Sequence, residues 1–322
     1  MKLIQKFQRP HCKTRGSLVY FDTVATGLEY PEGPISMPDG TFLVVEIKGG
    51  TLTRIYPDGA KETIAKLGGG PNGIAIGPDG NCFVCNNGGF DWHTDEFGPR
   101  PTLQPRNYSG GRIEKVDLNV GSVDVLYTEA DGIPLSGPND IVFDAYGGFY
   151  FTDLGKTRRY DQDKGRVMYA LPDGSNISTI IHPIDTPNGI GLSDDGKLLY
   201  VSETAPARLW AFEISSPGTI NKNPWPSPHG GRFVAGSNEY QKFDSLALES
   251  SGNICVATLI NGGISVVSPD GGIIEHVPFP DRYTTNICFG GATMTTAYIT
   301  LSQTGRLIAA NWPRSGLALA YP

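Results

Sequence analysis

A short β-rich unit recurs six times in this chain. Each copy opens with an acidic or amide residue, runs through apolar residues to a turn, and continues into a second β-rich run. Successive copies begin 40, 67, 49, 56 and 42 residues apart. The unit is therefore about 40 residues long with insertions, which is the length of a four-stranded propeller blade. The opening residues, which we call the anchors, are Glu32, Asn72, Asn139, Asn188, Asp244 and Asn286.

The first copy predicts the internal structure of a blade. Its four β-rich runs are separated by Asp39-Gly40, Gly49-Gly50 and Asp58-Gly59, pairs that tolerate the positive φ of hairpin turns. No segment of the chain shows a sustained helical period. The sequence therefore predicts an all-β protein, a six-bladed β-propeller with four antiparallel strands in each blade.

The two ends of the chain predict how the ring closes. Residues 17–28 alternate as a strand does, and the last repeat lacks a regular outer strand. We expect the N-terminal segment to supply that strand, because a closed ring protects its strand edges. On this interpretation residues 1–16 are an N-terminal extension, and residues 17–322 form one propeller domain.

Charge and cysteine content exclude several classes of partner and compartment. The net charge is −7, the isoelectric point is about 5.3 and no cluster of Lys and Arg occurs, so nucleic acid and anionic membranes are not expected partners. Neither a signal-like start nor an apolar run of 18 residues is present.

The five cysteines are an odd number, which favours reduced thiols and a cytoplasmic location. Cys82 and Cys85 would point to opposite faces of one strand, which argues against a metal or redox pair. The oligomeric state stays open.

Two insertions interrupt the repeats. The segment Gly88–Gly111 follows a strand end and carries several aromatic residues, among them Trp92. A long aromatic loop in a compact domain is more often functional than not, so we expect it to cover the site and to contact substrate through Trp92. The simpler alternative is a surface flap that packs on its own blade. The segment Pro217–Gly231 is interpreted as a rigid surface excursion.

The repeat places the anchors together. If the first strand of each blade lies nearest the axis, all six anchors lie on one rim of the channel, and the second strand ends on the same rim. That second set contains Glu46 and Asp153. A single Asn-Gly pair is usually a turn, but turn chemistry does not require an oxygen-bearing side chain in every blade. We therefore expect these oxygens to meet at the axis.

Oxygen ligands of this kind suit a hard cation such as Ca²⁺. Glu32, Asn139, Asn188 and Asp244 are the candidate metal ligands. They would fill about four of six to eight positions, so water and a substrate oxygen could occupy the rest and the ion could act as a Lewis acid. Zn²⁺, Mn²⁺ and Mg²⁺ stay open as alternatives.

Other catalytic patterns are missing from the sequence. It contains neither a Gly-x-Ser-x-Gly elbow nor a His-Glu-x-x-His pair, and its five histidines are scattered. The run Gly68–Gly73 fits a dinucleotide-binding fingerprint by its letters. It precedes a predicted strand and not a helix, so we treat it as a chance match.

In its anchor motifs the chain resembles the senescence-marker-protein/gluconolactonase/luciferin-regenerating-enzyme family. Members are six-bladed propellers, include bacterial lactonases and relate more distantly to diisopropyl-fluorophosphatase. The resemblance implies that Glu32, Asn188 and Asp244 bind a metal ion and that Asn139 is a fourth ligand or a substrate contact. Residues 139–153 most resemble the bacterial lactonase branch, and this resemblance implies that Asp140 of this chain also approaches the metal. The matching pieces are Tyr30–Pro34, Gly137–Asp144, Thr186–Ile190, Phe243–Ser245 and Asn286–Gly291.

One departure from the family concerns the substrate. The sugar-lactonase branch carries an arginine two residues before its blade-three asparagine, and this chain has Gly137 there. The resemblance therefore does not carry recognition of a polyhydroxylated sugar lactone over to this chain. The aromatic insertion indicates a less polar ring, and the substrate stays open.

The expected function is metal-dependent hydrolysis of a small-molecule lactone, in which water attacks a carbonyl polarised by the ion. Asp244 is the first candidate for the base and Asp153 the second. Asn72, Asn139, Trp92 and Glu46 are the candidate substrate contacts. Two alternatives stay open: a phosphotriesterase-like or other ester hydrolase on the same ion, and a non-enzymatic ligand-binding propeller.

Overall fold

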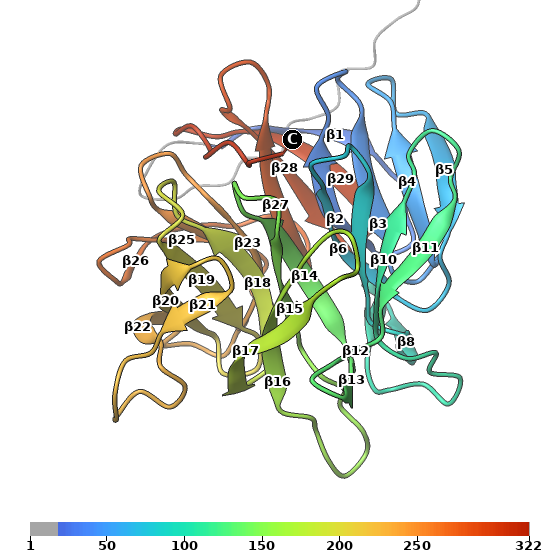
Figure 1. Ribbon diagram of the computed structural model, residues 1–322. Coiled ribbons are helices and arrows are strands. Elements are labelled where there is room, and N and C mark those ends of the chain that lie inside the picture. Colours follow the sequence, from blue (N-terminus) through green and yellow to red (C-terminus); the bar gives the residue numbers. More distant parts are fainter. Residues whose placement is uncertain (1–18, 322) are drawn as a thin grey trace, which may run out of the picture.

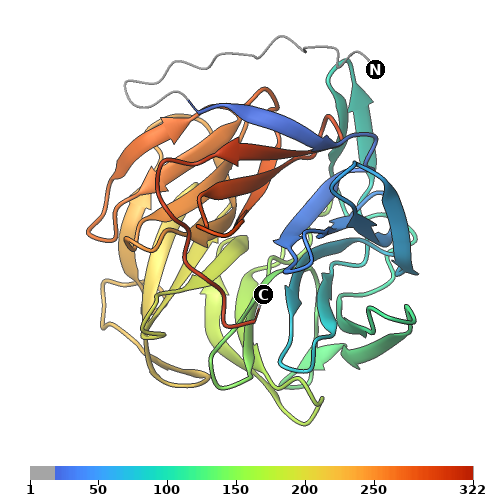
Figure 2. The same ribbon diagram turned by 90° about the horizontal axis from the view of Figure 1, so that it is seen from above.

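The computed structural model describes residues 19–321, which contain strands, turns and loops and no helix. Six sheets surround a common axis as the blades of a β-propeller (Figures 1 and 2), so the predicted fold is confirmed. The predicted extension, residues 1–16, lies outside the described residues, as do Ser17, Leu18 and Pro322. Between residues 19 and 321 the chain forms no helix that is long and apolar enough to span a membrane.

The blades follow the order of the chain. Blade one contains β2 (Pro31–Ser36), β3 (Phe42–Glu46), β4 (Thr51–Ile55) and β5 (Lys61–Lys66). Blade two contains β6 (Pro71–Ile76), β7 (Cys82–Asn86), β10 (Arg112–Val116) and β11 (Val123–Tyr127). Blade three contains β14 (Pro138–Phe143), β15 (Phe149–Asp153), β16 (Gly165–Ala170) and β17 (Ile177–Ile184). Blade five contains β23 (Lys242–Leu248), β24 (Ile254–Leu259), β25 (Gly263–Val267) and β26 (Ile273–Val277).

Blade four departs from the four-strand pattern. It contains β18 (Pro187–Leu192), β19 (Leu198–Glu203), β20 (Arg208–Ser216), β21 (Thr219–Asn221) and β22 (Arg232–Gly236). Both β21 and β22 pair with the long β20, at different positions along its outer edge. The segment expected to be a surface excursion therefore supplies β21 and the loop to β22, with Trp225 exposed on that loop.

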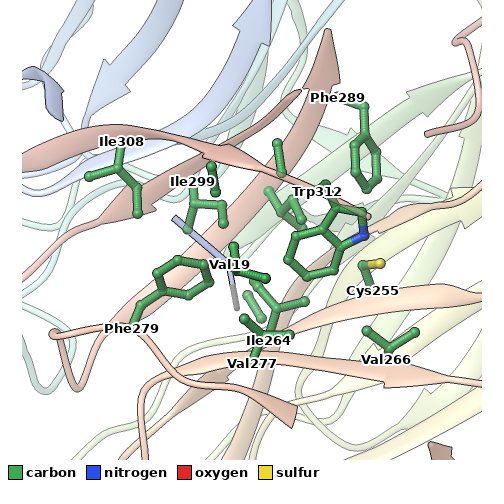
Figure 3. Packing of buried hydrophobic residues seen from close by; sticks show 14 of the residues in the cluster. Val19, Cys255, Ile264, Val266, Val277, Phe279, Phe289, Ile299, Ile308 and Trp312 are labelled. Atoms are coloured by element: carbon green, nitrogen blue, oxygen red, sulfur yellow. The ribbon is translucent and has the colours of Figure 1, made fainter. Parts of the chain in front are cut away.

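Blade six closes the ring as predicted. It contains β27 (Thr284–Gly290), β28 (Thr296–Leu301), β29 (Arg306–Asn311) and the N-terminal β1 (Phe21–Ala25). β1 pairs antiparallel with β29, with Phe21 opposite Ala310. Just before β1, Val19 is buried between blades five and six beside Phe279 and Trp312 (Figure 3). The N-terminal segment thus joins the ring through both strand pairing and apolar burial.

Two further hairpins lie outside the blades. One is β8 (Trp92–Asp95) with β9 (Gly98–Pro101), and the other is β12 (Glu129–Ala130) with β13 (Ile133–Pro134). The four cysteines within the described residues are free.

The last residues of the chain run across the rim opposite the anchors. Arg314 and the indole of Trp312 bind the buried carboxylate of Glu249 in blade five. Further on, the Leu317 amide donates to the Leu248 carbonyl at 2.8 Å, and the Tyr321 ring contacts Phe143 of blade three. The described chain ends near the centre of the ring (Figure 2). We call residues 312–321 the C-terminal strap.

Candidate active site

The six anchors lie at the start of the six inner strands, on one rim. These strands contact one another in the order β2, β6, β14, β18, β23 and β27, and β27 returns to β2. In each inner strand the pairing with its neighbour shifts register within the first few residues, where the anchor lies. Such bulges redirect side chains. The repeat therefore brings all six anchors together, and all are buried.

Close packing of the inner strands explains why glycine follows three of the anchors, Glu32, Asn72 and Asn188. A Cβ at Gly33 would stand 2.8 Å from the Asn72 carbonyl, and one at Gly189 would stand 2.7 Å from the Asp244 carbonyl. Only glycine fits at such distances. In blade three the corresponding residue is Asp140, which is buried and whose side chain joins the anchors. We call the six anchors together with Asp140 the anchor cluster.

Three carboxylates of the anchor cluster influence one another. Burial raises the pKa of Glu32 to about 7, and burial together with the charge of Glu32 raises the pKa of Asp140 to about 7. Burial and the charges of Glu32 and Asp140 raise the pKa of Asp244 well above its ordinary value. The ion pairs of the described residues all involve other carboxylates. This concentration of negative charge is therefore without a neutralising Lys or Arg among residues 19–321.

The amides of the cluster leave oxygens available. Asn286 donates from Nδ2 to Oε2 of Glu32 at 2.8 Å, and Asn188 donates from Nδ2 to Oγ1 of Thr204 at 3.0 Å. Oδ1 of Asn188 accepts only a long contact of 3.5 Å from Ser245. Oδ1 of Asn139 is buried without any hydrogen-bond partner. A buried polar atom normally has a partner, so the Asn139 oxygen indicates a ligand.

These observations fit a hard divalent cation. Buried carboxylates and amide oxygens are its preferred ligands, and a cation would compensate the mutual repulsion that raises the three pKa values. No group of three or more His, Cys, Asp or Glu side chains in the described part of the chain is arranged so that it could hold a metal ion. A cation site here therefore needs the oxygens of Asn139 and Asn188 in addition to carboxylates.

The candidates at the ends of the second strands have other partners. Asp153 accepts from the amides of Ser136 and Gly137 and pairs with Arg166 at 2.9 Å. Glu46 accepts from the Glu29 amide and from Thr53 at 2.6 Å each. Both carboxylates thus bind strands and loops of their own blades. The corresponding ends of β7 and β19 do the same, since Asn86 binds Glu114 and Glu203 binds Arg208 and Trp210.

The aromatic insertion reaches the anchors from blade two. The ring of Trp92, in β8, packs edge-on against Tyr30 with centroids 5.0 Å apart. Tyr30 precedes the first anchor by two residues, and burial together with the nearby Asp244 charge raises its pKa well above the ordinary value. The segment Gly88–Gly111, which we call the cap, therefore lies beside the anchor cluster and not only on its own blade.

The tip of the cap contacts blade six. The guanidinium of Arg282 lies 3.7 Å from the centre of the Phe97 ring. Nε2 of Gln303 donates to the Gly98 carbonyl at 3.4 Å, and a Cβ at Gly98 would stand 2.3 Å from the Gln303 carbonyl. The cap thus extends from blade two to the strand ends of blade six.

Sequence reasoning gave no role to two neighbours of the anchors, Tyr30 and Tyr283. The two rings lie 6.1 Å apart, and burial raises the pKa of the Tyr283 hydroxyl. Both residues stand in loops just before inner strands, Tyr30 two residues and Tyr283 three residues ahead of an anchor. That position close to an anchor was the available signal.

A surface pocket on the opposite rim carries no comparable chemistry. Ser193, Asp195 and Ser250 line it together with Leu317 of the strap. Its one buried carboxylate, Glu249, is already bound by Arg314, Trp312 and Asn253. The anchor cluster is therefore the candidate active site.

Comparisons with known proteins agree with this architecture. Lactonase drp35 of Staphylococcus haemolyticus is 27% identical over 259 residues, which cover 78% of this chain and 70% of that protein. A gluconolactonase structure from Xanthomonas campestris matches with a TM-score of 0.72 at 20% identity and covers 96% of both chains. The structure of regucalcin, a calcium-binding protein from Agrobacterium tumefaciens, matches with a TM-score of 0.69 at 17% identity, over 90% of this chain and 94% of that one.

The family match runs from Tyr30, ahead of the first anchor, to Gln303, which contacts the cap. The family described as "SMP-30/Gluconolactonase/LRE-like region" matches residues 30–303, and this range contains all six inner strands. The chain belongs to the SMP-30/gluconolactonase/LRE-like family.

Proposed function

We propose that this protein is a lactonase that opens its substrate by hydrolysis at the anchor cluster with the help of a divalent cation. The observation that carries the proposal is the cluster itself: three buried carboxylates without a basic partner, beside the unpartnered Oδ1 of Asn139. The lactonase and gluconolactonase names of the relatives support the reaction, and the calcium-binding neighbour supports the cation.

Glu32, Asn139, Asn188 and Asp244 would hold the ion, with Asp140 beside them. When bound, a divalent cation supplies Lewis-acid polarisation of the lactone carbonyl and lowers the pKa of nearby acids. The ion is Ca²⁺ in our proposal, because only oxygen ligands are present.

The protein side chains then have separate roles. A carboxylate oxygen of Asp244 accepts the proton of the attacking water as the new bond forms between the water oxygen and the carbonyl carbon. The ring C–O bond breaks, and the proton passes to the departing alkoxide. Asn72 and Asn139 orient the ring, while Trp92 and Tyr30 cover its outer face. Asp153 and Glu46 hold the rim, because their oxygens bind Gly137, Arg166 and Thr53.

We also propose that the substrate is a small molecule and that the protein works in the cytoplasm, where thiols stay reduced. The four free cysteines support this location.

A panel assay tests the function. The purified protein is incubated with apolar lactones, a sugar lactone and a phosphotriester, and acid release is followed with and without chelator. We expect chelator-sensitive hydrolysis of a lactone that returns when Ca²⁺ is added. Calcium binding without hydrolysis of any ester would indicate a binding protein, and phosphotriester turnover alone would indicate the related reaction on the same ion.

A further inference from the structure

A lysine in blade three is buried under the root of the cap. Lys156 is only 1% exposed. Its Nζ donates to Oδ1 of Asn87 at 3.0 Å and to the Gly89 carbonyl at 2.7 Å. The same atom lies 4.0 Å from the centre of the Phe90 ring and 5.4 Å from that of Tyr108. All four partners belong to the cap or to the residue just before it, so the Lys156 side chain contacts both ends of the insertion.

Neighbouring contacts strengthen this attachment. The Gln104 amide donates to the Thr157 carbonyl at 2.9 Å, and Arg158 donates to Oε1 of Gln104 at 3.3 Å. The hydroxyl of Tyr108 donates to the Ser136 carbonyl at 2.5 Å. The root of the cap therefore rests on blade three, whereas Trp92 contacts Tyr30 ahead of blade one and the tip contacts blade six. Between these supports the cap lies beside the anchors.

The surroundings of Lys156 do not include an ion pair. Asp153 and Asp163 face it from blade three, but Asp153 binds Arg166 and Asp163 binds Arg158. The partners within hydrogen-bonding distance are two neutral oxygens, which match the two N–H groups of an uncharged amine. Burying a lysine without a paired charge is costly, so such a residue needs a role.

We propose that Lys156 is a positioning residue that pins the root of the cap to blade three and thereby keeps Trp92 against Tyr30 beside the anchor cluster. Which lactones are bound then depends on Lys156, although it does not touch them. This inference rests on the proposed function for its substrate consequences. The pinning itself is independent of any reaction.

The pin has a pH dependence whose sign follows from burial. Burial lowers the pKa of Lys156 to about 7, while the Asp153 and Asp163 charges oppose the shift. When the cap lifts, the amine meets water and its pKa returns to about 10. The docked state thus binds protons less readily than the lifted state. The docking equilibrium constant should rise by about tenfold per pH unit between pH 7 and about 10, and should be constant below pH 7. Tyr108 and Arg158, the other titratable groups at the root, should stay in one protonation state across that range.

Hydrogen exchange of the cap amides tests the pin without any substrate. We compare the whole protein with Lys156→Met, which keeps the apolar stem and removes both donors, and with Lys66→Met, an exposed lysine on β5. Residues 88–111 of Lys156→Met should lose about tenfold or more of their protection, because the Gly89 carbonyl loses its lysine donor and Oδ1 of Asn87 keeps only the Gly89 amide. Lys66→Met should match the parent protein. After correction for intrinsic exchange, only the proteins with Lys156 should gain cap protection as the pH rises above 7.

Kinetics supply the second measurement. On a lactone that the parent protein hydrolyses, Lys156→Met should raise KM by about tenfold and change kcat by less than about threefold. If Lys156→Met fails to fold, Phe90→Leu is used in its place. This change removes the contact of Lys156 with the Phe90 ring and leaves both hydrogen bonds of Lys156, so the loss of cap protection should be smaller. Parent-like protection of residues 88–111 in Lys156→Met, or in Phe90→Leu where that variant replaces it, would overturn the proposal. A protein that hydrolyses no lactone but shows the exchange effect would overturn the function and leave the pin intact.

Discussion

The side-chain amide of Asn286 donates a 2.8 Å hydrogen bond to Oε2 of Glu32, and so joins the last anchor to the first. The two residues are 254 positions apart in sequence. They meet where blade six, completed by β1, closes on blade one. Ring closure and assembly of the candidate site are therefore the same event, because the anchor cluster is complete only when these blades meet.

Removing this hydrogen bond should weaken cation binding. In Asn286→Ala, Oε2 of Glu32 loses its side-chain amide donor and keeps the Gly33 amide, so the Glu32 carboxylate is held less firmly. Loss of such an orienting partner typically costs about 10- to 100-fold in metal affinity. Calorimetric titration with Ca²⁺ measures the effect. Replacing Asn119, an exposed amide on a turn, by alanine is the control, and an unchanged affinity in Asn286→Ala would contradict the prediction.

Removing the cation should lower thermal stability. A ligand that binds only the folded state stabilises it by about 2.7 kcal/mol at a concentration of 100 times Kd, and here it also relieves repulsion among three buried carboxylates. The melting temperature should rise by several degrees when Ca²⁺ is added to chelator-treated protein. Glu32→Gln should lose most of this rise, whereas Glu129→Gln, an exposed site on β12, should keep it. A calcium-independent melting temperature in the parent protein would argue against the site.

Asp244→Asn should separate binding from catalysis. The amide keeps an oxygen for the ion but cannot accept the proton of water, so kcat should fall by about two to four decades while calcium still binds. Asp194→Asn changes an exposed carboxylate on a turn of the preceding blade and should keep normal turnover. Near-normal kcat in calcium-loaded Asp244→Asn would move the role of base away from this residue.

Shortening the cap should change which lactones are preferred. Asp91 and its neighbours Thr102 and Leu103 exchange backbone hydrogen bonds, so residues 92–101 can be replaced by two glycines without moving the root. The ratio of kcat/KM between an apolar and a polyhydroxylated lactone should shift by about tenfold or more, since loss of one apolar contact surface is worth about 1–3 kcal/mol. The melting temperature should change little. Unaltered selectivity would show that the hairpin packs on blade two without a role in substrate choice.

The repeat made the fold predictable, because each blade repeats the same turn chemistry around one oxygen-bearing residue. The prediction of four strands was wrong for blade four, where β21 and β22 both pair with the outer edge of β20. The sequence pattern does not show whether a long strand pairs with one neighbour or with two. The pairing of β1 with β29 could be predicted because the last repeat lacks an outer strand of its own.

The site was predictable only where the repeat determined it. The anchors share one position in the blade, so their convergence followed from symmetry. Asp140 and Asp153 both lie near the rim of blade three. The family resemblance pointed to Asp140, whose pKa the Glu32 charge raises, but the sequence could not show that Asp153 is bound by Arg166. The reach of the cap to Gln303 was likewise hidden, because no local pattern encodes a contact 205 residues away.

The C-terminal strap affects the route by which a small molecule can reach the anchors. Arg314 and Trp312 fasten it to Glu249, and it continues to Leu248 and Phe143 at the ends of inner strands. We therefore expect a small molecule to reach the anchors from the side of the cap. Substrate and product would then use the same opening, so a product must leave before the next substrate enters.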